Sequence, residues 1–225
     1  MKFVVTAGPT REYLDPVRFL SNPSTGKMGF AVARAAAMRG HEVALVAGPV
    51  SLKTPKGVRR IDVTSAREML AAVERELSQQ APSTVFVSTA AVADWRPAKC
   101  AARKLKKGQM SGILKLVRNP DILKTVARRT KTTHSPTHPL THSPTYLVGF
   151  AAETNDVLAE ARRKCREKNL DMIVANDVTE RGSGFGVDTN RVTFVRKDGS
   201  VERLPLMTKL AVARRIVREC EDLCP

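Results

Sequence analysis

Long hydrophobic runs are absent from the sequence. None of its apolar stretches approaches the roughly 18 residues that a membrane-spanning helix needs, and the apolar part of the N-terminal MKFVVTAGPTRE is too short for a signal peptide. We therefore expect a cytoplasmic protein with no membrane partner. The hydrophobic content of 42% is ordinary for a packed globular core.

Cysteine is scarce and scattered. The four cysteines are Cys100, Cys165, Cys220 and Cys224, and the nearest pair is C-x-x-x-C at the end of a helical pattern. This arrangement does not suggest a zinc site, so we expect no metal-ligating cluster. Free thiols in a reducing compartment are the simplest interpretation.

Acidic and aromatic residues are also few. The chain has 38 Lys and Arg against 22 Asp and Glu, a formal charge of +16, but only 4% aromatic residues. Such a charge implies an anionic partner without choosing between nucleic acids and small phosphorylated ligands. Because nucleic-acid readers usually interleave aromatic with basic residues, and no such signature is present, a nucleic acid is the weaker alternative.

The segment FLSNPSTGKMGF resembles a phosphate-binding Walker loop but lacks two of its fixed positions. Gly26 and Lys27 are present, whereas Ser21 replaces the first glycine and Met28 replaces the hydroxyl residue. The connection formed by residues 8–25 is longer than an ordinary strand-to-helix loop. The end of this connection predicts a capping hydroxyl and free backbone N–H groups at the start of a helix. These groups either bind an anion or serve only as a helix cap.

A dinucleotide oxidoreductase is a second alternative, because glycines near the first strand can be aligned with a Rossmann fingerprint. The second strand, however, ends in VAGP, with no acidic residue to hold a ribose hydroxyl. Neither Tyr13 nor Tyr146 has a lysine four residues later. Both observations count against hydride transfer.

Apolar strand-like runs alternate with helical patterns along the chain. Nearly continuous runs such as VALVA and VFV predict strands covered on both faces, and Lys197-Asp198-Gly199-Ser200 predicts a turn between two C-terminal strands. We therefore expect an α/β fold: a Rossmann-like three-layer sandwich with a mostly parallel sheet and a C-terminal β-hairpin. Residues 1–225 are expected to form a single domain.

One tract, residues 131–145, differs from the rest because it is rich in histidine and proline. Its three histidines are spaced by four residues, but the intervening prolines exclude the helix that would align them. Such a tract cannot bury enough apolar area to order itself, so we expect a mobile surface loop rather than a metal site.

Small and polar residues follow several predicted strands, where ligands bind in parallel sheets. TAGPTRE follows the first strand, TAAVADWRP the fourth, GFAAET the next and AND the one after that. The small residues 89–93 allow a ligand to approach the backbone, unless they only permit close helix packing. Lys164 and Lys168 share a helical face, and residues 103–107 are basic; both are either phosphate contacts or solvated charges.

Together these segments resemble phosphopantothenate-cysteine ligases. The matching motifs, in chain order, are TAGPTREYLDPVRFLSNPSTGKMGFAVA, LVAGPVSL, AAVADWRP, KLKK, NPDIL, VGFAAET, KNLDMIVAND and FGVDTNRV, which span nearly the whole chain. The resemblance implies a ligation in coenzyme A biosynthesis. The 4'-phosphopantothenate carboxylate attacks the α-phosphate of CTP or ATP, and the amine of L-cysteine then displaces the nucleotide from the acyl-nucleotide. Bacterial members usually use CTP and eukaryotic members ATP, and the sequence does not decide between them.

The resemblance also implies site residues. Asn22 matches the asparagine that acts on the acyl-nucleotide, and Asn22 and Ala91 match substrate-binding positions. The implied nucleotide-binding residues are Thr89, Ala90, Asp94, Lys104, Pro120, Asp121, Ile122, Leu123, Phe150, Lys164 and Lys168. The lysines would meet the phosphates, and Phe150 the base or sugar.

Cofactors and assembly are implied in the same way. The triphosphate implies Mg²⁺, although the sequence contains no ligand cluster for it. The chain starts directly at the ligase motifs, so we expect no FMN and expect decarboxylation on another polypeptide. Family members are generally homodimers, and the C-terminal hairpin is the contact that we expect.

Three features depart from the family pattern without removing a matched functional residue. SNPST replaces the more familiar S-N-H-S-S, Trp95 replaces a common Tyr, and Arg103 replaces a frequent Glu.

Overall fold

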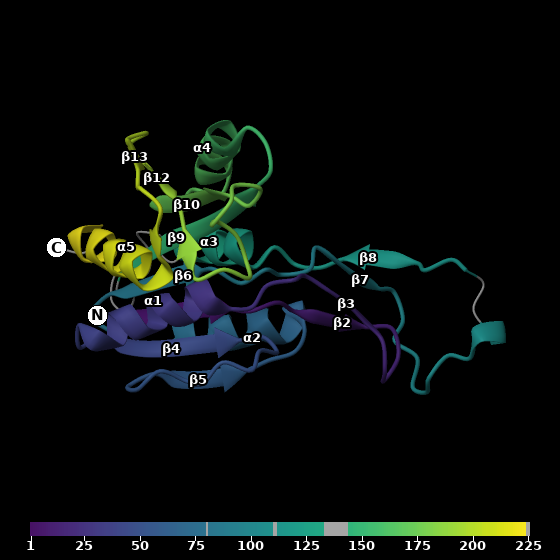
Figure 1. The fold of residues 1–225 in the computed structure, drawn as a ribbon. Helices are drawn as coiled ribbons and strands as arrows, with labels where there is room; N and C mark the ends of the chain where they lie inside the picture. Colours follow the sequence, from purple (N-terminus) through teal and green to yellow (C-terminus); the bar gives the residue numbers. More distant parts are fainter. Residues whose placement is uncertain (80, 110–111, 133–143, 224–225) are drawn as a thin grey trace.

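An eight-stranded sheet forms the centre of the computed structural model, which describes residues 1–79, 81–109, 112–132 and 144–223 (Figure 1). Its strand order is β13-β12-β10-β9-β6-β1-β4-β5. The strands are β1 (Lys2–Ala7), β4 (Glu42–Ala47), β5 (Arg59–Asp62), β6 (Thr84–Ser88), β9 (Thr145–Glu153), β10 (Met172–Asp177), β12 (Thr193–Arg196) and β13 (Val201–Arg203). All neighbours pair in parallel except β10–β12 and β12–β13, so the predicted C-terminal hairpin is confirmed.

Helices cover both faces of this sheet, which confirms the three-layer arrangement (Figure 1). The helices are α1 (Lys27–Met38) and α5 (Lys209–Leu223) over one face, and α2 (Ala66–Leu77), α3 (Ile122–Thr132) and α4 (Val157–Glu167) over the other. Every residue of β1 is buried, and its side chains alternate between the two cores. A strand covered on both faces needs apolar residues at every position, which explains the continuous runs in the sequence.

An arm projects from the carboxyl ends of the strands, away from the two termini (Figure 1). It consists of two antiparallel pairs, β2 (Arg11–Tyr13) with β3 (Phe19–Ser21) and β7 (Trp95–Pro97) with β8 (Leu116–Arg118), and a short 3₁₀ helix, η1 (Lys107–Gln109). The buried carboxylate of Asp15 links the two pairs, because it accepts the backbone N–H of Leu105 at 3.1 Å and binds the Arg18 guanidinium. Residues 8–25, expected to be one long loop, therefore contain a hairpin.

Two short strands, β11 (Thr189–Asn190) and β14 (Met207–Thr208), pair beside α5. Most of the His/Pro-rich tract, residues 133–143 with its histidines, lies outside the described residues, as does Cys224. Cys100, Cys165 and Cys220 form no disulfide, in agreement with the expected reduced thiols. Among the described helices, none combines the length and apolar character that crossing a bilayer requires.

Candidate functional site

A pocket of about 110 Å³ lies at the carboxyl end of the sheet, beside the N-terminus of α1. It is lined by Ser24, Thr25, Gly26, Lys27, Met28, Gly29, Thr89, Ala90, Ala91, Phe150, Ala152, Asn176, Gly184, Phe185, Asn190 and Lys209. Four predicted site residues, Thr89, Ala90, Ala91 and Phe150, therefore meet at one place. The first three follow β6, and Phe150 lies within β9, the neighbouring strand of the sheet.

The first wall of the pocket is the start of α1. Gly26 occupies the N-cap position with a left-handed φ of 78°, and no side chain caps the helix. The prediction that a hydroxyl caps this helix is therefore wrong. Thr25 Oγ1 instead donates to the Phe185 carbonyl at 2.8 Å. Because uncapped N–H groups and the helix dipole both favour negative charge, this wall suits a phosphate or carboxylate.

The second wall is the segment Thr89–Ala91, which hydrogen bonds hold against the first strand. Thr89 Oγ1 donates to the Thr6 carbonyl at 2.5 Å, and the Ala91 N–H donates to the Gly8 carbonyl at 3.0 Å. Gly29 of α1 packs directly on this segment, since a Cβ atom there would lie 2.4 Å from Thr89 Oγ1. Small residues thus serve two purposes here: they admit α1, and they leave backbone accessible in the pocket.

Asn22 lies immediately after β3, at the junction between arm and pocket. Its Nδ2 donates to the Ala91 carbonyl at 3.0 Å, so the two predicted substrate residues are in direct contact. An amide has two N–H donors and one carbonyl acceptor. The contact with Ala91 therefore fixes the side chain while leaving donor capacity for a ligand.

Lys164 and Lys168 lie outside this pocket and each binds a carboxylate. Lys164 Nζ pairs with Glu153 at the end of β9, and Lys168 Nζ pairs with Asp121 Oδ2 at 2.8 Å. Burial alone would raise the pKa of Asp121, but the bonds from Lys168 and from the Lys124 N–H hold it below its ordinary value. The structure therefore joins two predicted nucleotide residues, Asp121 just before α3 and Lys168 just after α4, by an ion pair, and it places Lys164 on α4.

The remaining predicted residues connect the pocket to these helices and to the arm. Asn119 donates from its backbone to the Asp94 carbonyl and from its side chain to the Ala93 carbonyl, both at 2.8 Å, which places Pro120 beside exposed Asp94. The side chains of Ile122 and Leu123 belong to the core, so only their backbone is suited to a ligand contact. Lys104 is exposed on the arm.

Sequence reasoning missed the third wall of the pocket, which comes from the end of β10 and from residues after it. Asn176 is the middle residue of the motif AND, Phe185 lies in the glycine-rich segment GSGFG, and Lys209 begins α5. The motif AND was noticed only as a strand end. Lys209 carried no signal in the sequence, because its proximity depends on how α5 packs.

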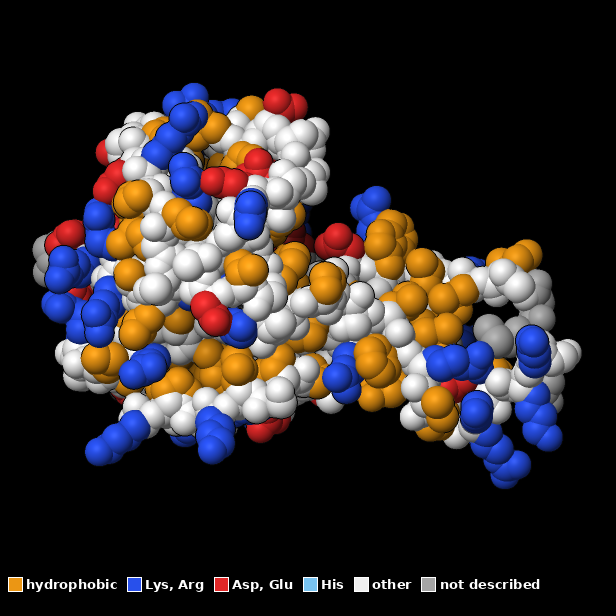
Figure 2. All heavy atoms as spheres, in the orientation of Figure 1, with side chains coloured by type: hydrophobic (Ala, Val, Ile, Leu, Met, Phe, Trp, Pro, Cys, Tyr) orange, Lys and Arg blue, Asp and Glu red, His pale blue; other side chains and the backbone are white. Residues whose placement is uncertain are grey.

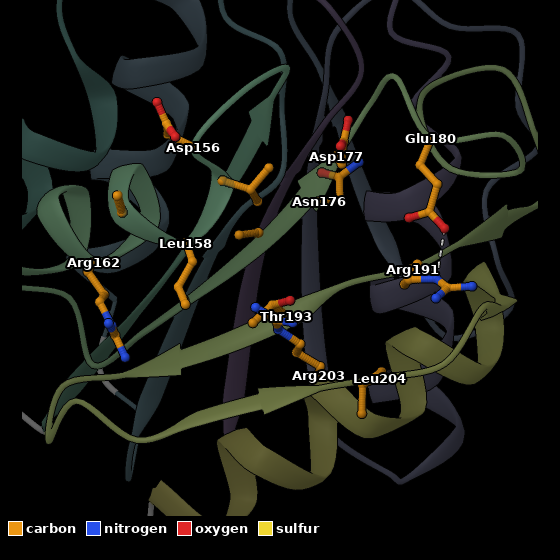
Figure 3. Close-up of a pocket in the computed structure, with 13 residues that line it drawn as sticks. Asp156, Leu158, Arg162, Asn176, Asp177, Glu180, Arg191, Thr193, Arg203 and Leu204 are labelled. Atoms are coloured by element: carbon orange, nitrogen blue, oxygen red, sulfur yellow. Dashed lines mark ion pairs between the residues drawn. The ribbon is translucent and has the colours of Figure 1, made fainter.

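A second, larger cavity of about 680 Å³ lies between α4 and the β12–β13 hairpin (Figure 3). Its charged lining consists of Arg162, Arg191, Arg203, Asp156, Asp177 and Glu180. Arg191 Nε forms an ion pair with Glu180 at 2.9 Å, and Asn176 lines both cavities (Figure 3). Since positive and negative groups are balanced, this cavity does not favour an anion. The predicted nucleotide residues lie elsewhere.

The protein side chains at the site suit Mg²⁺ only if nucleotide phosphates supply most of its other ligands. Within the described ranges, no three His, Cys, Asp or Glu side chains gather into a metal-binding group. Mg²⁺ needs no such cage, because one or two carboxylates and the phosphates of a nucleotide hold it together with water. The exposed Asp94 beside Pro120 supplies one carboxylate of this kind.

Comparisons with known proteins agree with this geometry. The sequence profile of the DNA/pantothenate metabolism flavoprotein C-terminal domain matches residues 1–223. The coenzyme A biosynthesis bifunctional protein CoaBC of Vibrio cholerae is 47% identical over 218 residues, which are 96% of this chain and 51% of that protein. CoaBC of Bacillus subtilis is 48% identical over 221 residues, 98% of this chain and 51% of that protein. The chain thus spans about half the length of these curated relatives.

A solved structure covers the same part of these relatives. The crystal structure of a CoaBC C-terminal domain superimposes with a TM-score of 0.77 at 41% identity, covering 99% of this chain and 94% of that one. Its fold is the one described above. The chain belongs to the DNA/pantothenate metabolism flavoprotein C-terminal domain family.

Proposed function

We propose that this chain is a phosphopantothenate-cysteine ligase that acts in coenzyme A biosynthesis, in the cytoplasm, as a single domain. It would join 4'-phosphopantothenate to L-cysteine through an acyl-nucleotide formed from CTP or ATP. The observation that carries the proposal is the contact of Asn22 with Ala91 at the edge of the pocket formed by α1 and Thr89–Ala91. Family membership over residues 1–223 supports it.

In the first step, a carboxylate oxygen of phosphopantothenate forms a bond to the α-phosphorus, and pyrophosphate leaves. This step needs positioning and neutralisation of phosphate charge more than acid–base chemistry. The uncapped N-terminus of α1 would receive a phosphate, and Phe150 would contact the base or sugar. Lys164 and Lys168 would exchange Glu153 and Asp121 for phosphate oxygens.

In the second step, the cysteine nitrogen attacks the acyl carbon, the nucleoside monophosphate leaves and the nitrogen loses a proton. Negative charge develops on the acyl oxygen as the bond forms. Asn22 would donate its second N–H to that oxygen, while its first N–H stays on the Ala91 carbonyl. Asn22 would thus be the catalytic residue and Ala91 the residue that orients it.

Mg²⁺ would supply charge neutralisation on the triphosphate, with Asp94 as a protein ligand. Lys104 on the arm would add a further positive charge if the arm closes on the nucleotide. We expect the reaction to need no FMN, because a flavin plays no part in an acyl-nucleotide ligation.

Pyrophosphate release tests the proposal. The chain is incubated with 4'-phosphopantothenate, L-cysteine, Mg²⁺ and either CTP or ATP, and continuous release is expected only when all components are present. Without L-cysteine, release should stop after about one pyrophosphate per site, because the acyl-nucleotide is not discharged. Comparing the two nucleotides also decides which is preferred. No release with either one would refute the ligase assignment.

A thermal melt provides an independent check on the alternatives. Stabilisation by CTP or ATP is expected, since a ligand that binds the folded state raises the melting temperature. Stabilisation by NAD(P) alone would favour an oxidoreductase. Tight, salt-sensitive binding of generic oligonucleotides would favour a nucleic-acid-binding protein.

We also propose a homodimer, with the arm as its contact rather than the C-terminal hairpin. Large exposed hydrophobic residues gather on the arm (Figure 2): Val17, Phe19, Trp95, Ile113, Leu114 and Leu116. Ile113 is 84% exposed, and contiguous apolar patches of this kind typically mark interfaces. A second copy of the chain is the partner that the resemblance implies.

The double variant Ile113→Glu with Leu116→Glu is expected to dissociate this dimer, because two buried carboxylates would meet an apolar contact. Light scattering should give twice the chain mass of 24.6 kDa for the wild type and the single mass for the variant. Met38→Glu is a matched control, since Met38 is 59% exposed on the body of the protein. A wild type of single mass would refute the dimer.

A further inference from the structure

The third wall of the small pocket includes Gly184 and Phe185, which belong to the segment Gly184–Asp188 after β10. This segment faces the start of α1, because Thr25 and Lys27 bind it. Gly182, just before the segment, and Gly184, its first residue, have positive φ angles of 84° and 118°, and the chain turns here without forming a helix or strand. A wall of this kind is free to move unless side chains hold it. Its anchors therefore decide the shape of the pocket.

Lys209 is the principal anchor. It begins α5, is only 6% exposed and points its ammonium group into the turn. Nζ donates to the carbonyls of Gly184 at 2.8 Å, Phe185 at 3.1 Å and Val187 at 2.7 Å. An ammonium group has three donors, so the turn uses all of them.

Burial of the Lys209 ammonium group disfavours its charged form. Burial, together with the nearby charge of Lys27, lowers the pKa of Lys209 to about 8, and Asp188 opposes this shift only in part. The turn offers neutral carbonyl oxygens instead of a directly bonded carboxylate. A hydrophobic residue would fill the same space without the cost of desolvation, so the hydrogen bonds are the feature that requires lysine.

A second anchor comes from the opposite wall. Lys27, the first residue of α1, donates from Nζ to the Gly186 carbonyl at 2.9 Å and to Asp188 Oδ1 at 2.7 Å. Thr25 Oγ1 adds the bond to the Phe185 carbonyl described above. The turn is therefore bound to α5 on one side and to α1 across the pocket.

We propose that Lys209, assisted by Lys27, is a positioning residue that holds the Gly184–Asp188 wall at the distance at which it closes on the bound nucleotide. This inference rests on the proposed function. Lysine suits the role because a compact ammonium group directs its donors to carbonyls on different sides, whereas a planar guanidinium does not. The residue acts through the wall and takes no part in the chemical steps.

The test uses Lys209→Met, Lys27→Met and, as a control, Lys56→Met, which changes an exposed lysine that does not line the pocket. Lys209→Met should raise the KM for the nucleotide about tenfold while kcat changes much less, because the wall contributes to binding in both ground and transition states. Lys27→Met should show a smaller rise, since Lys27 is half-exposed and holds only one side. Hydrogen exchange should increase in residues 182–188 and remain unchanged in the central strands.

Three results would overturn the inference while the wild type remains active: an unchanged KM in both variants, unchanged exchange in residues 182–188, or a loss confined to kcat. Full recovery of KM in Lys209→Arg would also contradict it, because charge alone would then suffice. A wild type that releases no pyrophosphate would instead refute the proposed function. If Lys209→Met does not fold, Lys27→Met carries the same comparison.

Discussion

Replacing Asn22 with aspartate is expected to leave nucleotide binding intact and to stop the reaction after the acyl-nucleotide has formed. The aspartate has no N–H to donate, its charge repels the developing acyl oxygen, and it faces the Ala91 carbonyl that Asn22 Nδ2 binds at 3.0 Å. Loss of one donor to such an oxygen typically lowers the rate by about 10²- to 10³-fold. Pyrophosphate should appear in an initial burst without the amide product, and the acyl-nucleotide should accumulate.

Asn155→Asp is the matched control for this prediction, because it introduces the same charge at an exposed position before α4. It should release pyrophosphate and form amide as the wild type does. Normal amide formation by Asn22→Asp would remove Asn22 from the mechanism. Failure of that variant even to bind nucleotide would assign Asn22 to binding instead.

The second large effect is expected from Gly29→Ala, which should displace α1 from the sheet. The new methyl group would lie 2.4 Å from Thr89 Oγ1, 2.5 Å from Ala7 Cβ and 2.9 Å from the Thr6 carbonyl oxygen. Backbone and short side chains cannot move aside as a long flexible side chain would. Overpacking of this kind costs about 1–3 kcal/mol of the free energy of unfolding, and more where the backbone is rigid.

Gly29→Ala should lose nucleotide binding as well as stability, because α1 supplies one wall of the pocket. Denaturant unfolding measures the first effect, and the shift of the melting temperature on adding CTP or ATP measures the second. Gly108→Ala is the control, because a Cβ atom there meets nothing within 4 Å and Gly108 does not line the pocket. Wild-type stability and binding in Gly29→Ala would show that α1 does not need its close approach to Thr89.

The candidate site could be predicted where its residues follow strands. Thr89, Ala90 and Ala91 follow β6, and Phe150 comes directly after the last β9 residue that pairs with β6, so parallel pairing of these strands brings them together. Asn22 could be predicted only through the resemblance to known ligases, because its partner is the Ala91 carbonyl, 69 residues away in sequence. The partners of Lys164 and Lys168 are Glu153 on β9 and Asp121 before α3, so they depend on how α4 packs, which helical periodicity does not specify.

The arm shows the opposite case, an element that sequence patterns failed to predict. Its four strands have three residues each, too few for an alternating pattern to emerge. Asp15 looks like an ordinary loop residue, yet its carboxylate links residues that lie 90 positions apart. Short strands paired over such distances are stabilised by tertiary contacts, so local propensity carries little information about them.

By itself, the sequence determined the sandwich, its mostly parallel sheet and the C-terminal hairpin, because buried strands and amphipathic helices require distinctive residue patterns. It also determined that the strand ends carry the small and polar residues of a site. Only the tertiary structure decided that Asn22 meets Ala91, that the expected helix cap is absent and that Lys209 holds the turn opposite α1. These contacts join segments far apart in the chain, and their geometry depends on packing that no local pattern encodes.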